Sequence, residues 1–254
     1  MRFAVLGSGS KGNATLIESH GTRVLVDCGF TLADTEQRLA RLGVEPAALD
    51  AILVTHEHGD HLSGVGRLAR RHRVPVWMTH GTYAVWRDRD VPHCLRFSPH
   101  QPFRIGALEI QPYPVPHDAR EPCQYVVAAA AGRLGILSDA GHITVHMRDI
   151  LSGCDALMLE CNHDPEMLES GPYPPALKRR VGGVSGHLSN AQAAQLLRHC
   201  EPARLQHLVL THLSESNNTP QLARAAIDPF MDGATDRVVC ADQTAGMDWR
   251  ELVA

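Results

Sequence analysis

One polar turn, Thr55–His61, constrains this chain more than any other segment, because it follows directly on an apolar run. The run, residues 51–54, reads Ala-Ile-Leu-Val and is typical of a buried strand. The apolar pattern after the turn predicts a helix over 62–71. Imidazole and carboxylate groups are ligands that zinc, manganese and iron prefer. A histidine-rich surface loop is the alternative to a metal site on this strand-to-helix turn. The candidate ligands, in the pattern H-x-H-x-D-H, are His56, His58, Asp60 and His61.

The order of the apolar segments predicts two sheets packed face to face with helices outside. Residues 14–27, 103–113 and 124–138 each read as a pair of strands around a turn, and such antiparallel neighbours exclude an ordinary doubly wound sheet. We therefore expect an α/β protein in which residues 1–254 form a single domain. Further strands are expected at 3–6, 51–55, 74–78, 155–160, 206–211 and 237–240, and helices at 34–42, 62–71, 190–199 and 220–227.

Composition narrows the class of protein. Hydrophobic residues make up 44% and charged residues 20% of the chain, as in ordinary globular proteins. No apolar stretch approaches the ~20 residues that span a bilayer, and the apolar N-terminal run is too short for a signal peptide. The 7 cysteines form no C-x-x-C pair, which favours reduced thiols and a cytoplasmic location over disulfides or a cysteine zinc site. We expect no membrane partner, and the sequence leaves the oligomeric state open.

Four more candidates stand where apolar runs end. Asp27 follows Val-Leu-Val, His117 follows Val-Pro, Asp139 follows Ile-Leu-Ser, and His212 follows Val-Leu-Thr. Strands that each deliver one Asp or His at the carboxyl end can present ligands along one rim of a sheet. Taken singly, a histidine at a strand end is more often a structural residue, and an aspartate there is usually a turn residue.

A glycine-rich segment, Gly7–Gly12, spells G-x-G-x-x-G after a strand. A dinucleotide site would need a helix next, whereas the following residues alternate like a strand. The alternatives are a plain glycine turn, or a loop whose backbone N–H groups, with Lys11 and Asn13, reach the edge of an active site.

The second half of the chain carries two more polar motifs. Glu160 ends an apolar strand and is followed closely by His163. His187 lies just before the predicted helix 190–199, where the helix dipole favours an anion such as phosphate. The alternatives to a catalytic or phosphate-binding role are structural: Glu160 would be a turn carboxylate, and His187 a residue of the loop that caps the helix. The candidate substrate-binding residues are Asn13, Lys178, Arg179, Arg180, Ser189 and Asn190.

In this order of ligands the chain resembles the metallo-β-lactamase superfamily. The resemblance implies a four-layer αββα sandwich with two divalent metal ions at one edge, Zn²⁺ or Mn²⁺, with iron also possible. Two such cations ~3.5–4 Å apart can share a hydroxide and clamp the attacking and leaving oxygens. By this likeness the first metal is bound by His56, His58 and His117, the second by Asp60, His61 and His212, with Asp139 bridging both and Asp27 orienting ligands from outside the metal sphere.

The second half is similar to the YycJ/WalJ-like exonuclease group. The runs that carry the likeness are Gly171–Arg180, Gly186–Asn190 and His212–Pro220. The resemblance implies a metal-dependent phosphodiesterase that hydrolyses nucleic-acid phosphodiester bonds as a 5′→3′ exonuclease. The expected catalytic residues are Asp60, Glu160, His163 and His187, of which Glu160 and His187 would relay a proton to the leaving oxygen with support from His163.

Two alternative functions stay open. The net charge of -4 argues against tight duplex binding, so a small, for example cyclic, nucleotide is an alternative substrate to DNA or RNA. A thioester hydrolase of the glyoxalase II type shares T-H-x-H-x-D-H, but only a predicted helix and strand follow His212, where that class normally continues into a helical domain.

Overall fold

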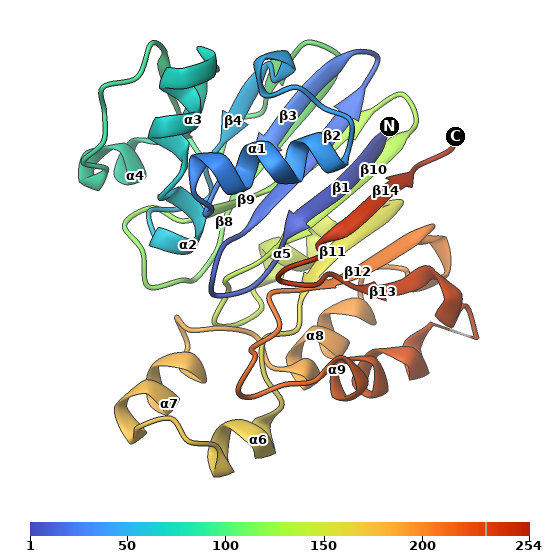
Figure 1. The fold of residues 1–254 in the computed structure, drawn as a ribbon. Helices are drawn as coiled ribbons and strands as arrows, with labels where there is room; N and C mark the ends of the chain where they lie inside the picture. Colours follow the sequence, from blue (N-terminus) through green and yellow to red (C-terminus); the bar gives the residue numbers. More distant parts are fainter. Residues whose placement is uncertain (232) are drawn as a thin grey trace.

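Two seven-stranded sheets form the centre of the computed structural model, which describes residues 1–231 and 233–254 (Figure 1). The strands of the first sheet are β1 (Arg2–Gly7), β2 (Ala14–Ser19), β3 (Thr22–Val26), β4 (Ala51–Leu53), β5 (Val76–Thr79), β6 (Cys94–Phe97) and β14 (Met247–Glu251). Those of the second are β7 (Phe103–Ile105), β8 (Leu108–Pro114), β9 (Cys123–Ala129), β10 (Gly132–Leu137), β11 (Ala156–Glu160), β12 (His207–Thr211) and β13 (Val238–Cys240).

The two sheets share one plan. The first has the order β14-β1-β2-β3-β4-β5-β6 and the second β13-β12-β11-β10-β9-β8-β7. In each, strands early in the chain pair antiparallel, as in β1–β2–β3 and β7–β8–β9–β10. Later strands pair parallel, as in β3–β4–β5–β6 and β10–β11–β12–β13. The predicted mixture of hairpins and parallel strands is therefore confirmed.

Helices cover the outer face of each sheet, which completes four layers (Figure 1). The helices on the first half are α1 (Leu32–Arg41), α2 (Gly59–Leu62), α3 (Val65–His72) and α4 (His80–Val85). Those on the second are α5 (Val145–Leu151), α6 (Pro165–Ser170), α7 (Pro175–Val181), α8 (Asn190–Leu197) and α9 (Pro220–Ile227). Short 3₁₀ turns lie at Pro46–Ala48, Pro202–Arg204, Asp228–Phe230 and Thr235–Arg237. The αββα class predicted from the sequence is confirmed.

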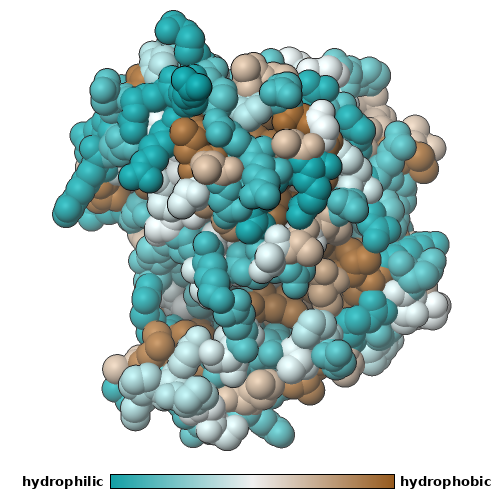
Figure 2. Space-filling view, viewed as in Figure 1, coloured by the Kyte–Doolittle hydropathy of each residue, from teal (hydrophilic) through white to brown (hydrophobic). Residues whose placement is uncertain are grey.

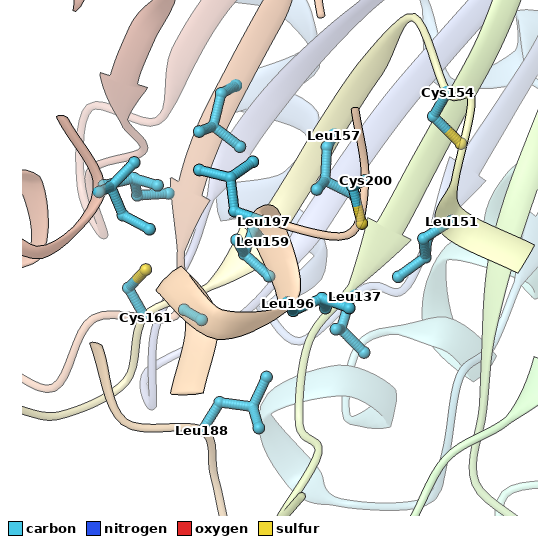
Figure 3. Packing of buried hydrophobic residues seen from close by; sticks show 14 of the residues in the cluster. Leu137, Leu151, Cys154, Leu157, Leu159, Cys161, Leu188, Leu196, Leu197 and Cys200 are labelled. Carbon is cyan, nitrogen blue, oxygen red and sulfur yellow. The ribbon is translucent and has the colours of Figure 1, made fainter. Parts of the chain in front are cut away.

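Alternation along the strands produces the layers. In β11, Ala156 and Met158 point between the sheets, whereas Leu157 and Leu159 point toward the outer helices. This is the period of two that a pleated strand imposes. Figure 3 shows Leu157, Leu159, Leu196 and other residues of the outer cluster packed together beneath α8.

The structure also differs from the predictions. The helix expected over 62–71 is two helices, α2 and α3, separated at Gly64. A side chain at Gly64 would collide with the Phe30 carbonyl, since a Cβ there would lie 2.1 Å from that oxygen. The sequence analysis missed several short or edge elements: β6, α4, α5, α6, α7 and β14.

The packing of the outer cluster predicts a large effect of Leu157→Ala, because Leu157 is fully buried. The substitution should lower the free energy of unfolding by ~2–5 kcal/mol, through lost transfer energy and the cavity left behind. Chemical denaturation would measure it, with Leu222→Ala, at a position 38% exposed on α9, as the control. Equal losses for both variants would contradict this core assignment.

Candidate metal centre

Six strands of the two sheets end at the same edge, and polar side chains follow each end. β3, β4, β8, β10, β11 and β12 run in the same sense within their own sheets. Their carboxyl ends therefore deliver side chains from distant parts of the chain to one place. The residues at or just after these ends are Asp27, His56, His117, Asp139, Glu160 and His212.

Three of these residues have unusual backbone conformations. Asp27, Asp139 and His212 have positive φ angles of 61°, 51° and 54°. This left-handed region is uncommon for residues other than glycine, and such residues concentrate at functional sites. The chain thus turns sharply at each of these three strand ends, and the turn places the side chain at the sheet edge.

The first ligand group consists of His56, His58 and His117. His56 Nε2 lies 3.0 Å from His58 Nδ1, and His117 Nε2 lies 3.1 Å from the same atom. Nitrogens about 2.0–2.1 Å from one tetrahedral zinc would lie about 3.3 Å apart. The group therefore has the donor type and spacing of a three-histidine metal site.

The second group consists of Asp60, His61 and His212, with Asp139 beside it. Asp60 Oδ2 lies 3.5 Å from His61 Nε2 and 3.4 Å from His212 Nε2. Asp139 contacts His61 Nε2 at 3.1 Å through one oxygen and His212 Nε2 at 3.7 Å through the other. Asp139 also groups with His56 of the first set, so its carboxylate lies between the two ligand groups.

Asp27 organises the turn that carries the motif. Its carboxylate accepts hydrogen bonds from the Thr55 N–H and hydroxyl, both at 2.8 Å. It also accepts from Nδ1 of His61 at 2.8 Å, which leaves Nε2 of that ring free for a metal. The neighbouring Gly29 permits close approach of the Asp60 backbone, because a Cβ there would lie 1.8 Å from the Asp60 carbonyl oxygen.

Other buried polar groups orient the remaining ligands. Nδ1 of His117 donates to the Gly186 carbonyl at 3.0 Å, which again leaves Nε2 toward the centre. Asn162 donates to the His212 carbonyl at 2.9 Å. The amide of Asn13 donates to the carbonyl of Asp60 at 3.3 Å. These contacts match the outer hydrogen bonds that fix ring orientation in metal sites.

The two groups differ in charge. Burial opposes protonation of His61 and His212, but the surrounding carboxylates outweigh it. Asp139 and Asp27 raise the pKa of His61 well above its usual range, and Asp139 and Asp60 help to raise the pKa of His212 to about 10. Without a cation, both rings of the second group are therefore protonated at neutral pH.

In the first group, burial lowers the pKa of both His56 and His117. These rings are neutral at pH 7 and keep a lone pair for a metal. Neutral imidazoles, ionised carboxylates and the spacing above fit divalent cations of the zinc and manganese type.

Glu160 and His187 form a separate pair beside Asp139. Nδ1 of His187 donates to Glu160 Oε1 at 2.7 Å and lies 3.4 Å from Asp139 Oδ1. The other Glu160 oxygen accepts from the N–H groups of Ala140 and Leu188 at 3.0 and 3.1 Å. Burial opposes ionisation of Glu160, but His187 lowers the pKa of this carboxyl to about 2. The Glu160 carboxylate, in turn, raises the pKa of His187 against the effect of burial.

A cavity of about 330 Å³ opens onto these groups. Asp60, Asp139, His187 and His212 line it on the side of the centre, and Ser10 of the glycine loop lines another side. Residues of α7 and of the loop before it close the cavity opposite: Tyr173, Leu177, Arg180 and Val181.

The structure separates the residues predicted to bind substrate. Arg180 lines the cavity, whereas Lys178 and Arg179 line a different cavity on the other side of α7. His163, which was predicted as a catalytic residue, also lines that second cavity. Asn13, whose side-chain amide donates to the Asp60 carbonyl, does not line the cavity that Arg180 lines.

Ser189 and Asn190 have structural contacts in the structure. Ser189 caps α8 by accepting from the N–H of Gln192 at 3.3 Å. Asn190 is buried and exchanges hydrogen bonds of 2.9 Å with Asn218.

The sequence analysis assigned no role to several residues that the structure brings to the site. Asp118 lies 3.5 Å from His117 and 3.7 Å from His58, and Asn162 holds His212. The signal for Asp118 was its place directly after His117. Leu177 and Val181 of α7 carry a weaker signal, the four-residue spacing of apolar side chains on one helix face. Tyr173, in the loop before α7, has no such signal.

Comparison with known proteins agrees with this arrangement. A family model described as "Beta-lactamase superfamily domain" matches residues 22–213. Exodeoxyribonuclease YycJ of Bacillus anthracis is 33% identical over 236 residues, which cover 91% of this chain and 89% of the relative. Exodeoxyribonuclease WalJ of Streptococcus pneumoniae is 31% identical over 257 residues, which cover 98% and 92%.

Solved structures show the same fold. The metallo-β-lactamase fold protein YhfI from Bacillus subtilis superposes with a TM-score of 0.75 at 19% identity, over 98% of each chain. The resemblance stated from the sequence is therefore confirmed: the chain belongs to the β-lactamase superfamily domain family, in the group that contains YycJ and WalJ.

Proposed function

We propose that this protein is a phosphodiesterase that depends on two divalent metal ions and hydrolyses nucleic-acid phosphodiester bonds, as a 5′→3′ exodeoxyribonuclease. The names of its relatives YycJ and WalJ support DNA as the substrate. The observation that carries the proposal is the pair of ligand groups with Asp139 between them, open to a cavity that also contains His187.

The ligands we assign follow the two groups. His56, His58 and His117 would hold one ion and Asp60, His61 and His212 the other, and Asp139, which lies between the two groups, would serve both. Zn²⁺ or Mn²⁺ fits these donors best, with iron as an alternative. When bound, the two ions would lower the pKa of a water molecule, so that hydroxide forms near neutral pH, and would neutralise charge on the phosphodiester.

The chain's own residues supply proton transfer. His187 is held by Glu160 through Nδ1, so its Nε2–H is available to donate a proton to the leaving oxygen. Its raised pKa favours the protonated form that this step needs. The side chain of Asp60 is 23% exposed and faces the cavity, where its carboxylate can orient the attacking water.

We assign His163 a positioning role. Its backbone forms a bridge with Ser189 and accepts from the Asn190 N–H at 2.9 Å. These contacts tie the loop after Glu160 to the loop that carries His187. Ser189 and Asn190 act in the same way, since both stabilise the start of α8.

A small nucleotide phosphodiester is the second candidate substrate, because the cavity of about 330 Å³ is at the lower end of the range for ligand pockets.

Location is a further part of the proposal. None of the helices in residues 1–231 and 233–254 is long and apolar enough to cross a bilayer. All seven cysteines are unpaired thiols, five of them buried, which supports a reducing, cytoplasmic environment.

The test of function is a panel of substrates with wild-type protein and Asp60→Ala. A labelled DNA duplex, bis-p-nitrophenyl phosphate and S-lactoylglutathione are assayed with and without Mn²⁺ and Zn²⁺. We expect metal-dependent hydrolysis of the first two. Asp60→Ala should abolish it and leave about one ion or fewer per chain by metal analysis, because a ligand of the second metal is lost. Asp149→Ala, an exposed substitution on α5, is the control. Hydrolysis of the thioester alone would reject the proposal.

His187→Ala separates catalysis from metal binding. Turnover should fall by about 10²-fold or more, as expected for a lost general acid, while metal content stays at the wild-type level. His100→Ala, at an exposed position, should change neither. Loss of metal from His187→Ala would instead make this histidine a ligand.

Metal binding should release protons, because His61 and His212 are protonated in the metal-free protein at pH 7. Their ring nitrogens must lose a proton before they coordinate, so about two protons per chain should leave on loading of both ions. Isothermal titration calorimetry in buffers of different ionisation enthalpy measures the number. Binding heats that do not depend on the buffer would contradict the assigned second group.

A further inference from the structure

α7 faces the metal centre with apolar side chains, yet none of its seven residues is buried. Tyr173, Leu177 and Val181 are spaced four residues apart, line the cavity and remain half-buried. In Figure 1, α6 and α7 project from the body of the protein below α2, and Figure 2 shows apolar atoms in this region of a mostly hydrophilic face. An apolar helix face that covers no core is available to contact a ligand.

Arg180 adds a cation to the same wall. Its side chain is 59% exposed, and among the described residues its one ion-pair partner is Asp118, with Nε 2.6 Å from Oδ2. The other Asp118 oxygen lies 3.7 Å from His58 and 3.5 Å from His117. Asp118 thus holds the guanidinium between the apolar wall and the first ligand group. A guanidinium recognises phosphate through paired hydrogen bonds, so this position suits a phosphate next to the one being cleaved.

The geometry of α7 separates Arg180 from its basic neighbours. A helix turns by about 100° per residue, so Arg179 points away from Leu177 and Val181, whereas Lys178 and Arg180 lie on opposite flanks of that face. Arg180 lines the cavity at the metal centre, whereas Lys178 and Arg179 line the cavity on the other side of the helix, where Lys178 donates to the Glu169 carbonyl. The wall therefore combines one aromatic ring, apolar contacts and a single directed cation.

We propose that α7 forms the subsite for one nucleotide flanking the scissile phosphate, with the base stacked on Tyr173 and packed against Leu177, and the nucleotide's other phosphate bound by Arg180. The proposal rests on the proposed function. It specifies which nucleotide of the DNA strand contacts Tyr173, Leu177 and Arg180. Charge complementarity, continuity with the metal centre and a cavity near the size of one nucleotide support this occupant. Stacking is tolerant of sequence, because every base has a π face.

The test compares a substrate that has a flanking nucleotide with one that has none. Tyr173→Ala and Arg180→Ala should each lower kcat/KM on a single-stranded DNA oligonucleotide by about tenfold or more, mainly through KM, because a base contact or a phosphate contact is lost. On bis-p-nitrophenyl phosphate, which has neither a second phosphate nor a base, the loss caused by each variant should be smaller than on DNA by about fivefold or more. Tyr173→Phe keeps the ring and should restore activity on DNA.

Two control variants test whether the effect of Arg180→Ala depends on its position and not only on its charge. Arg104→Ala removes the same charge from β7, where the side chain is 67% exposed, and should not change either activity. Arg179→Ala, on the opposite face of α7, should cost less on DNA than Arg180→Ala. Equal losses from Arg179→Ala and Arg180→Ala would indicate general attraction of DNA and overturn the subsite.

Two further outcomes separate this subsite from the proposed function. Equal losses on both substrates, or loss of bound metal, would show that α7 supports the centre rather than a nucleotide, and would overturn the subsite alone. If Tyr173→Ala hydrolyses DNA as fast as the wild type, the subsite is likewise overturned. Absence of wild-type activity on both phosphodiesters would reject the proposed function, and the subsite with it.

Discussion

Attraction between buried carboxylates and imidazoles is the interaction on which the centre depends. Asp139 and His61 are almost fully inaccessible to water, with side chains 2% and 1% exposed. Burial of either charge alone would be costly, and their contact at 3.1 Å offsets that cost. His212 and Asp60 extend the same network. Removal of one member leaves an uncompensated buried charge, so these residues act as a unit even before a cation replaces the protons.

The two sheets make such a polar cluster possible at an edge of an apolar sandwich. Strands such as β10, β11 and β12 carry mostly hydrophobic side chains, and a polar residue ends or directly follows each of them. The left-handed turns at Asp27, Asp139 and His212 stop each strand abruptly. The left-handed conformation of these turns costs free energy. The pairing of the strands that precede them offsets this cost, because each strand is held in place by its neighbours in the sheet. The centre is thus rigid because its ligands extend from the core.

In the proposed function, metal binding and substrate recognition are supplied by different parts of the molecule. The ligand groups come from strand ends and from α2, whereas α7 belongs to a short segment that adds no residue to the core. His187 and Glu160 connect the two, because the loop that carries His187 also contacts α7. A Cβ at Gly186 in this loop would lie 2.1 Å from the Arg180 carbonyl oxygen, so the close contact requires glycine. If α7 binds substrate as proposed, changes on this helix would alter which phosphodiester is held without altering the candidate ligands.

The sequence by itself determined the mixture of hairpins and parallel strands in two packed sheets and eight polar candidates at strand ends, because each depends on local pattern: apolar strands, tight turns and the polar residues that follow them. The family resemblance added the αββα class and the division of the candidates into two ligand groups. The sequence analysis missed α6 and α7, short helices in which only Leu168 of α6 is buried. It treated Lys178, Arg179 and Arg180 as one basic cluster, and only the tertiary structure directs Arg180 to the cavity and the other two away from it. The physical reason is that neighbours on a helix point in different directions, and which direction meets the metal centre is decided by how the helix packs.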